Sequence, residues 1–260
     1  MADRLYLSLW YPNFRLESLP AALAAVLRQF ALVGEKRVAA ASVYPINFTE
    51  APTYQRIYRA VERPPHFDPL APIDLADDSA DALIDAAVAE ATQQLHDDMA
   101  YEFEVRWQLW IPKDREYAYN RLGIAATRYA DRDDPDPDTD LPPLIQPEDA
   151  WHMRTHTVRI LGFGPKFDSA GFEQNGQILV DFGIDTPWVP DPHIPVAQPL
   201  SPSDAALDET AQIHIQQNVE KLLAFTLLVE KNCGISSRLL WTESGEPLAE
   251  KLIARLQRVH

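Results

Sequence analysis

Histidine and carboxylate side chains in the second half of the chain are the residues that could carry acid–base chemistry. His152 and His156 stand four positions apart, and Asp181 and His193 follow later in the sequence. If these four side chains converge in one pocket, the imidazoles and the carboxylate could act as general acids and bases. One hypothesis is therefore an enzyme with a pocket between two half-sheets that uses these residues.

The spacing of His152 and His156 also raises the question of a metal site. On a helix, two histidines four residues apart share a face and can bind one ion. The surrounding residues predict a strand instead, in which four residues span about 13 Å. Alternating carboxylates between Asp134 and Asp140 resemble the start of a calcium loop, but prolines separate them and no closing Glu follows. We therefore predict no metal and no cofactor.

A long acidic stretch is the most prominent charged feature of the chain. Residues 64–105 contain no Lys or Arg but eleven Asp and Glu. Part of this stretch predicts an amphipathic helix, because its apolar residues recur at intervals of three and four. Its carboxylates should therefore share an exposed face. The residues expected to bind a partner there are Asp81, Asp85, Glu90, Asp97 and Asp98.

Asp97 and Asp98 bear on whether this negative face has a role. Both are expected at the carboxyl end of a helix over residues 79–96, where the helix dipole disfavours a carboxylate by about 0.3–1 kcal/mol. A residue that destabilises its helix, with no neighbouring interaction to offset this, can be one that is retained for function. The alternative is a solvated helix face with a frayed end.

Composition narrows the class of protein. The chain has 39 Asp and Glu against 23 Lys and Arg, a formal net charge of −16, which repels nucleic acids and anionic membranes and attracts cationic partners. The single cysteine, Cys233, argues against a disulfide framework and a thiolate-ligated metal site. Since there is neither an apolar run of about 18 residues nor a basic leader segment, we expect a cytoplasmic protein that binds no membrane.

The elements of residues 1–111 follow the order strand, helix, strand, strand, helix, strand. Hydrophobic periodicity predicts strands over 4–11, 37–46, 54–61 and 101–111, and helices over 19–33 and 79–96. Ser18 is the expected N-cap of the first helix, and Gly34 its C-terminal cap. That order is the ferredoxin-like plan, an antiparallel sheet with helices on one face.

Residues 151–260 repeat part of the pattern after an acidic, Pro- and Asp-rich connection over 112–150. We expect a hairpin, then a helix, a strand and a helix, over residues 156–163, 177–184, 204–231, 236–242 and 247–258. The predicted class is α+β, with antiparallel sheets and helices on one face. Either there are two ferredoxin-like halves, the second degenerate, or one continuous domain is built on a larger mixed sheet.

Residues 222–229 are apolar on almost every side. A helix of this kind is buried on more than one side. It either lies between two layers of the same chain or forms a homo-oligomer interface through Leu222, Phe225 and Val229.

Together these features favour a non-enzymatic binding or regulatory protein whose negative face docks a basic protein or peptide. The acidic bias is visible in the sequence, whereas no catalytic signature is. The enzyme remains the alternative, and the two hypotheses differ in whether the candidate histidines and Asp181 converge in the fold.

Overall fold

A sheet of seven strands lies at the centre of the fold, and each of its pairings is antiparallel. The computed structural model describes residues 3–45, 55–57, 80–112, 151–167, 176–188 and 202–244. The strand order is β3-β2-β4-β5-β6-β1-β7. In chain order the strands are β1 (Arg4–Trp10), β2 (Ala40–Pro45), β3 (Gln55–Ile57), β4 (Met99–Pro112), β5 (Trp151–Phe163), β6 (Ile178–Ile184) and β7 (Ser237–Thr242).

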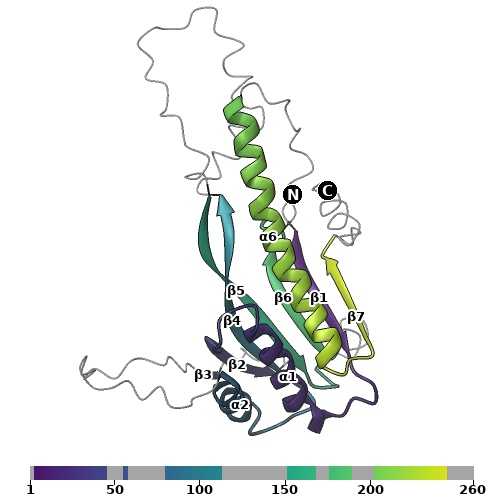
Figure 1. The fold of residues 1–260 in the computed structure, drawn as a ribbon. Coiled ribbons are helices and arrows are strands. Elements are labelled where there is room, and N and C mark those ends of the chain that lie inside the picture. Colours follow the sequence, from purple (N-terminus) through teal and green to yellow (C-terminus); the bar gives the residue numbers. More distant parts are fainter. Residues whose placement is uncertain are drawn as a thin grey trace, which may run out of the picture.

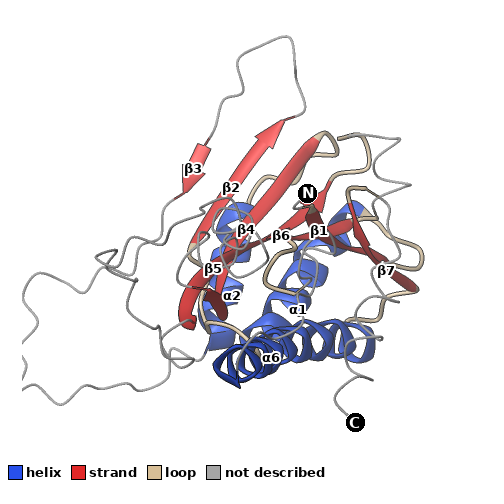
Figure 2. Ribbon diagram, turned by 90° about the horizontal axis from the view of Figure 1, so that it is seen from above, coloured by secondary structure: helices blue, strands red, loops and turns tan. Residues whose placement is uncertain are grey.

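The described helices cover one face of this sheet (Figures 1 and 2). They are α1 (Leu19–Ala31), α2 (Ala80–Ala91) and α6 (Pro202–Asn232). The predicted α+β class, the antiparallel pairing and the helices on one face are confirmed. None of these helices combines the length and the apolar character needed to cross a membrane.

The ferredoxin-like halves are not confirmed. That plan would keep β1 beside strands of its own half, but β1 pairs with β6 and β7, while β2 pairs with β3 and β4. Strands from both halves of the chain therefore share one sheet. A mixed sheet is not seen either, because the described pairings are all antiparallel.

The two residues predicted to cap α1 flank the helix, but they make other interactions than expected. A 3-10 turn, η1 (Leu16–Ser18), precedes the helix, and the Ser18 hydroxyl donates to the carbonyl of Arg15 (2.6 Å) instead of capping α1. Gly34 does follow the helix, and its N–H donates to the carbonyl of Phe30 (2.8 Å). A side chain there would collide with the Phe30 ring, so close packing is what requires this glycine.

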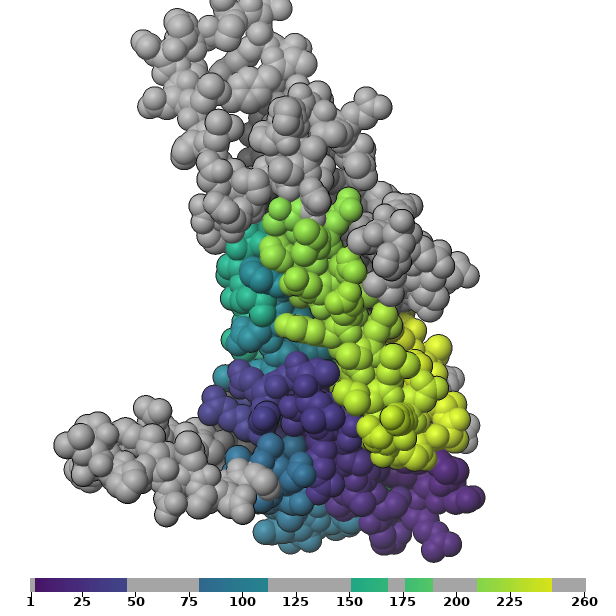
Figure 3. Space-filling model, in the orientation of Figure 1, coloured from purple at the N-terminus to yellow at the C-terminus, as the bar shows by residue number. Residues whose placement is uncertain are grey.

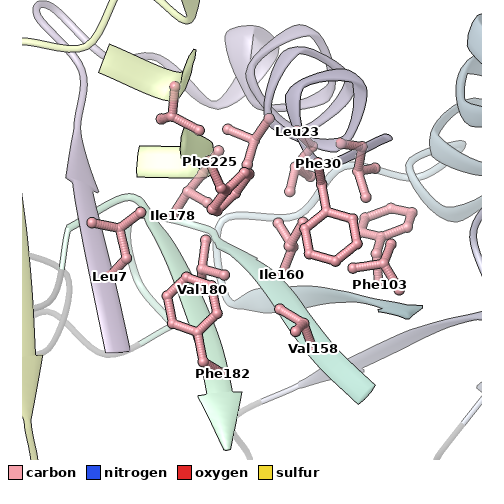
Figure 4. Packing of buried hydrophobic residues seen from close by; sticks show 14 of the residues in the cluster. Leu7, Leu23, Phe30, Phe103, Val158, Ile160, Ile178, Val180, Phe182 and Phe225 are labelled. Atoms are coloured by element: carbon pink, nitrogen blue, oxygen red, sulfur yellow. The ribbon is translucent and has the colours of Figure 1, made fainter. Parts of the chain in front are cut away.

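Aromatic and aliphatic side chains fill the space between the sheet and the helices (Figure 4). Phe30 of α1 meets Phe225 of α6 edge to face, with ring centroids 5.5 Å apart, and Phe225 lies 6.0 Å from Phe182 of β6. Leu222, Phe225 and Val229 are all fully buried inside the chain. Their burial favours the first of the two predicted alternatives, in which the helix lies between layers of its own chain; a homo-oligomer interface through these residues stays a prediction.

Helix α6 also covers one edge of β4, which pairs with β2 at residues 99–104. Beyond that point, Asn218 reaches the strand from α6: the N–H of Trp110 donates to its Oδ1 (3.0 Å), and its Nδ2 donates to the carbonyl of Trp110 (2.9 Å). The same Nδ2 lies 2.9 Å from the carbonyl of Pro187. One buried amide thus takes the place of a neighbouring strand.

Three predicted features lie outside the described residues. They are the acidic connection after Pro112, the helix over 247–258, and His193.

Replacing Phe225 with Ala should lower the free energy of unfolding by about 3–5 kcal/mol, because a buried aromatic side chain is lost and a cavity is left. Urea denaturation followed by circular dichroism would measure the change. Leu227→Ala on the same helix is the control: this side chain is 58% exposed, and its loss should change stability by less than about 0.5 kcal/mol. Equal effects of the two changes would contradict the packing described above.

Replacing Asn218 with Ala should lower the free energy of unfolding by about 1–3 kcal/mol, because backbone groups of Trp110 and Pro187 lose their hydrogen-bond partner. Gln216→Ala removes a matched amide from the same helix, one that bonds Glu220 on the exposed side (2.9 Å). We expect this control to be nearly neutral in the same denaturation experiment. An Asn218→Ala variant as stable as the control would show that the edge of β4 does not need this residue.

Candidate functional site

The first candidate surface is the outer face of α2. Asp81 and Asp85 lie one turn apart and are exposed, with side-chain accessibilities of 66% and 52%. Both face Arg28 of α1: its Nε lies 3.7 Å from Asp81 Oδ1, and its Nη2 contacts Asp85 Oδ1. Arg28 therefore pairs with two carboxylates and links α2 to α1.

The turn after α2 carries the other carboxylates of this surface. The helix ends at Ala91 and not at residue 96, so Asp97 and Asp98 lie beyond its last turn and the predicted dipole cost does not apply to them. Asp97 Oδ2 is 2.6 Å from Lys166 Nζ, and this hydrogen bond lowers the pKa of Asp97. Asp98 beside it is exposed.

We use the name acidic surface for Asp81, Asp85, Glu90, Asp97 and Asp98. Among the described residues, Arg28 pairs with both Asp81 and Asp85, and Lys166 pairs with Asp97, so these two cations are shared among three carboxylates. A shallow depression of mixed charge borders it at the start of α2 and is lined by Glu35, Lys36, Arg37, Ala80 and Leu83. Figure 3 shows α1, α2 and α6 on this side of the molecule.

The second candidate surface lies on the opposite face of the sheet, away from the helices. Strand register sets one row of side chains across it, from β4 to β7: Glu104, Arg159, Asp181, Tyr6 and Trp241. Arg159 Nε lies 3.7 Å from a carboxylate oxygen of Glu104 and also 3.7 Å from one of Glu102. The rings of Tyr6 and Trp241 are tilted against each other with centroids 4.7 Å apart. The row therefore alternates charge and ends in two aromatic rings.

Asp181 has a structural task within that row. Its carboxylate accepts from Arg4 Nη2 (2.5 Å) and from the N–H of Gly183 (2.8 Å). Gly183 has a φ of +78°, and the register between β1 and β6 shifts at the same place. Asp181 therefore stabilises the irregularity in the pairing of β6 with β1. The charge of its carboxylate also raises the pKa of Arg4.

Of the predicted catalytic residues, the structure describes His152, His156 and Asp181. His156 pairs across the strands with Trp107 on the helix side of the sheet, and its Nε2 lies 2.5 Å from the carbonyl of Phe182. Asp181 stands on the other face, in the row described above. His152 lies four residues along β5 from His156, at the start of the strand. The structure therefore places His156 and Asp181 on opposite faces of the sheet.

Glu102 is a residue that the sequence did not single out. Its side chain is only 16% exposed, and the Tyr44 hydroxyl donates to it at 3.3 Å. Burial raises the pKa of Glu102, against the opposing effect of Arg159. Glu102 and Glu104 alternate with buried Phe103 and Val105, and that alternation could have indicated their place opposite the helices.

A third candidate site is a group of three aromatic rings, which joins the end of β4 and the start of β5 to α6. The His214 ring stacks on Trp110 with centroids 3.9 Å apart and lies 5.5 Å from the ring of Trp151. These three residues are distant in the sequence, and no periodicity connects them. Sequence reasoning could not have found this group.

Charged and aromatic side chains are thus what these surfaces offer for recognition. Within the described ranges, no group of three or more His, Cys, Asp or Glu side chains is placed to hold a metal ion. Comparison of the chain with protein-family models, with curated proteins and with solved structures found no match.

Replacing Glu102 with Gln should remove part of the pH dependence of stability. Since burial raises its pKa above the ordinary 4.5, the stability it contributes is present below that pH and is lost as the pH rises through the folded-state pKa. The melting temperature of the wild-type protein should therefore fall relative to that of Glu102→Gln as the pH rises from acid to neutral.

Asp97→Asn provides the contrast in the same experiment. The pKa of Asp97 is lowered from 3.8, so its contribution is present above that pH and is lost as the pH falls. Thermal melts of both variants across the acid range should therefore differ from wild type in opposite directions. The same trend in both would contradict these assignments.

Proposed function

We propose that the protein binds a basic protein or peptide through the acidic surface. The observation that carries this proposal is the sharing of cations among the described residues: Arg28 is shared by Asp81 and Asp85, and Lys166 pairs with Asp97 beside Asp98. The carboxylates keep a net negative charge after this pairing. That excess attracts a cationic partner and speeds its approach at low ionic strength.

The internal ion pairs are compatible with binding. Exposed pairs of this kind contribute only about 0–1 kcal/mol each, so lysine or arginine side chains of a partner can compete with Arg28 and Lys166 at little cost. Arg28 also fixes α2 against α1, where their buried faces already pack. A partner would therefore meet carboxylates held on a rigid pair of helices, which limits the entropy lost on binding.

The enzyme alternative has less support from the geometry. It requires His152, His156, Asp181 and His193 to line one pocket. Asp181 and His156 lie on opposite faces of the sheet, and each already bonds to neighbouring groups of the chain. The expected cytoplasmic location stays a prediction from the sequence.

Replacing Asp81, Asp85, Asp97 and Asp98 together with Asn should abolish capture of basic proteins. The immobilised variant and wild type would be exposed to native lysate at low salt, and captured proteins would be eluted by raising the salt and identified by mass spectrometry. We expect at least about tenfold less captured protein, equivalent to about 1.4 kcal/mol of binding free energy. Elution of the wild-type partner by salt should confirm the electrostatic character of binding.

The matched control changes the same number of charges elsewhere. Glu17, Glu220, Glu230 and Glu243 are exposed and lie outside the acidic surface, so replacing all four with Gln gives the same net charge. This control should capture the same partner as wild type. Undiminished capture by the Asn variant, or an equal loss in both variants, would refute a role for this particular surface.

A further inference from the structure

The far ends of β4 and β5 form a two-stranded ribbon. Among the described residues, β4 pairs with β2 at residues 99–104, and β5 pairs with β6 at 159–162. Residues 105–112 and 151–158 pair with each other beyond those limits. An isolated two-stranded ribbon is marginally stable. Its order therefore depends on α6, which runs along it in Figure 1.

Three side chains on one side of α6 hold the ribbon. His214 stacks on Trp110 at 3.9 Å, Asn218 bonds the N–H and the carbonyl of Trp110, and Lys221 Nζ donates to the carbonyl of Gln108 at 2.7 Å. Their spacing of four and three residues places them one above another on the helix. Helix α6 is therefore attached to the ribbon by a row that begins at a histidine.

His214 suits this row only in its neutral form. Its Nδ1 is buried and has no hydrogen-bond partner among the described residues. A neutral imidazole can leave one nitrogen unprotonated, but an imidazolium has two N–H donors. Protonation would therefore bury a donor that lacks an acceptor, which disfavours the protonated form. Nδ1 of His152, next to Trp151 on the ribbon, is buried and unpartnered in the same way.

The charged groups of this junction are mainly cationic. On the described parts of the ribbon the titratable or charged groups are Arg106 of β4 and His152, Arg154 and His156 of β5. On residues 210–222 of α6 they are His214 itself, Lys221 and Glu220, and the Glu220 carboxylate is exposed and bonded to Gln216 (2.9 Å). Burial lowers the pKa of His214, although the hydrogen bond between the His214 ring and the Gln217 side chain, which acts as acceptor, opposes this.

We propose that this junction is a pH-sensitive switch, in which protonation of His214 releases residues 210–222 of α6 from the ribbon. Release would uncover the edge of β4 at Gln108 and Trp110. An uncovered strand edge can pair with another chain. The switch is independent of the acidic surface, which lies on α2 and the turn after it.

Hydrogen exchange read by mass spectrometry tests this on the whole protein. Between about pH 8 and about pH 5, either side of the ordinary histidine pKa, protection of residues 210–222 and 105–112 should fall by at least about tenfold after correction for the chemical exchange rate. Protection of β1 and β6 should change far less. An even loss across all strands, or no loss in α6, would overturn the switch.

Variants identify the titrating group. His214→Phe keeps a ring against Trp110 but cannot be protonated, so the pH response of residues 210–222 should disappear. His96→Gln is the control, because His96 is exposed in the turn before β4, and its response should equal that of wild type. A wild-type response in His214→Phe, or its loss in His96→Gln, would overturn the proposal.

Discussion

The packing of α6 against the sheet is the interaction on which the rest of this structure depends. Phe225 lies in contact distance of Phe30 and Phe182, and Phe30 meets Trp107 of β4 with centroids 5.4 Å apart. These rings come from α6, α1, β6 and β4, so one cluster joins elements from the whole length of the chain. Aromatic side chains supply large buried areas, and these contacts therefore hold α1 in place under the sheet.

The acidic surface is positioned through the same cluster. On the buried side of α1, Phe30 contacts Phe225 of α6. On its other side, Arg28 pairs with Asp81 and Asp85 of α2. The arrangement of these carboxylates is thus set by how α1 is packed and not by α2 alone. Any loosening of the core would be transmitted to the surface proposed to bind a partner.

Much of the element sequence was predictable, because hydrophobic periodicity is local. Helix α6 extends over Pro202–Asn232 where residues 204–231 were expected, and β1 over Arg4–Trp10 where 4–11 were expected. Strand order was not predictable. Leu5, Leu7 and Leu9 determine which face of β1 is buried, but that alternation is compatible with many neighbours. The pairing of β1 with β6 and β7 depends on contacts between distant segments.

The end of α2 shows how tertiary contacts override a local pattern. Leu95 continues the apolar spacing and packs against the core, which is why the helix was expected to reach residue 96. The Tyr101 hydroxyl instead accepts from the N–H of His96 (2.8 Å) and donates to the carbonyl of Gln94 (3.0 Å). A side chain from the next strand therefore satisfies backbone groups that a longer helix would have used. The ion pairs of Arg28 with Asp81 and Asp85 could not be predicted for the same reason, since nothing near Arg28 in the sequence indicates these partners.

The acidic stretch that dominates the sequence is divided by the fold. Asp81 and Asp85 lie on a helix that covers one face of the sheet, whereas Glu102 and Glu104 of β4 lie on the opposite face. Arg159 lies 3.7 Å from a carboxylate oxygen of each of those two glutamates, so both belong to the row of charges on that face. A run of carboxylates in a sequence therefore need not become one surface. Since strand alternation sends part of it to the far side, the surface proposed to bind a cationic partner contains just a part of this stretch, on α2 and the turn after it.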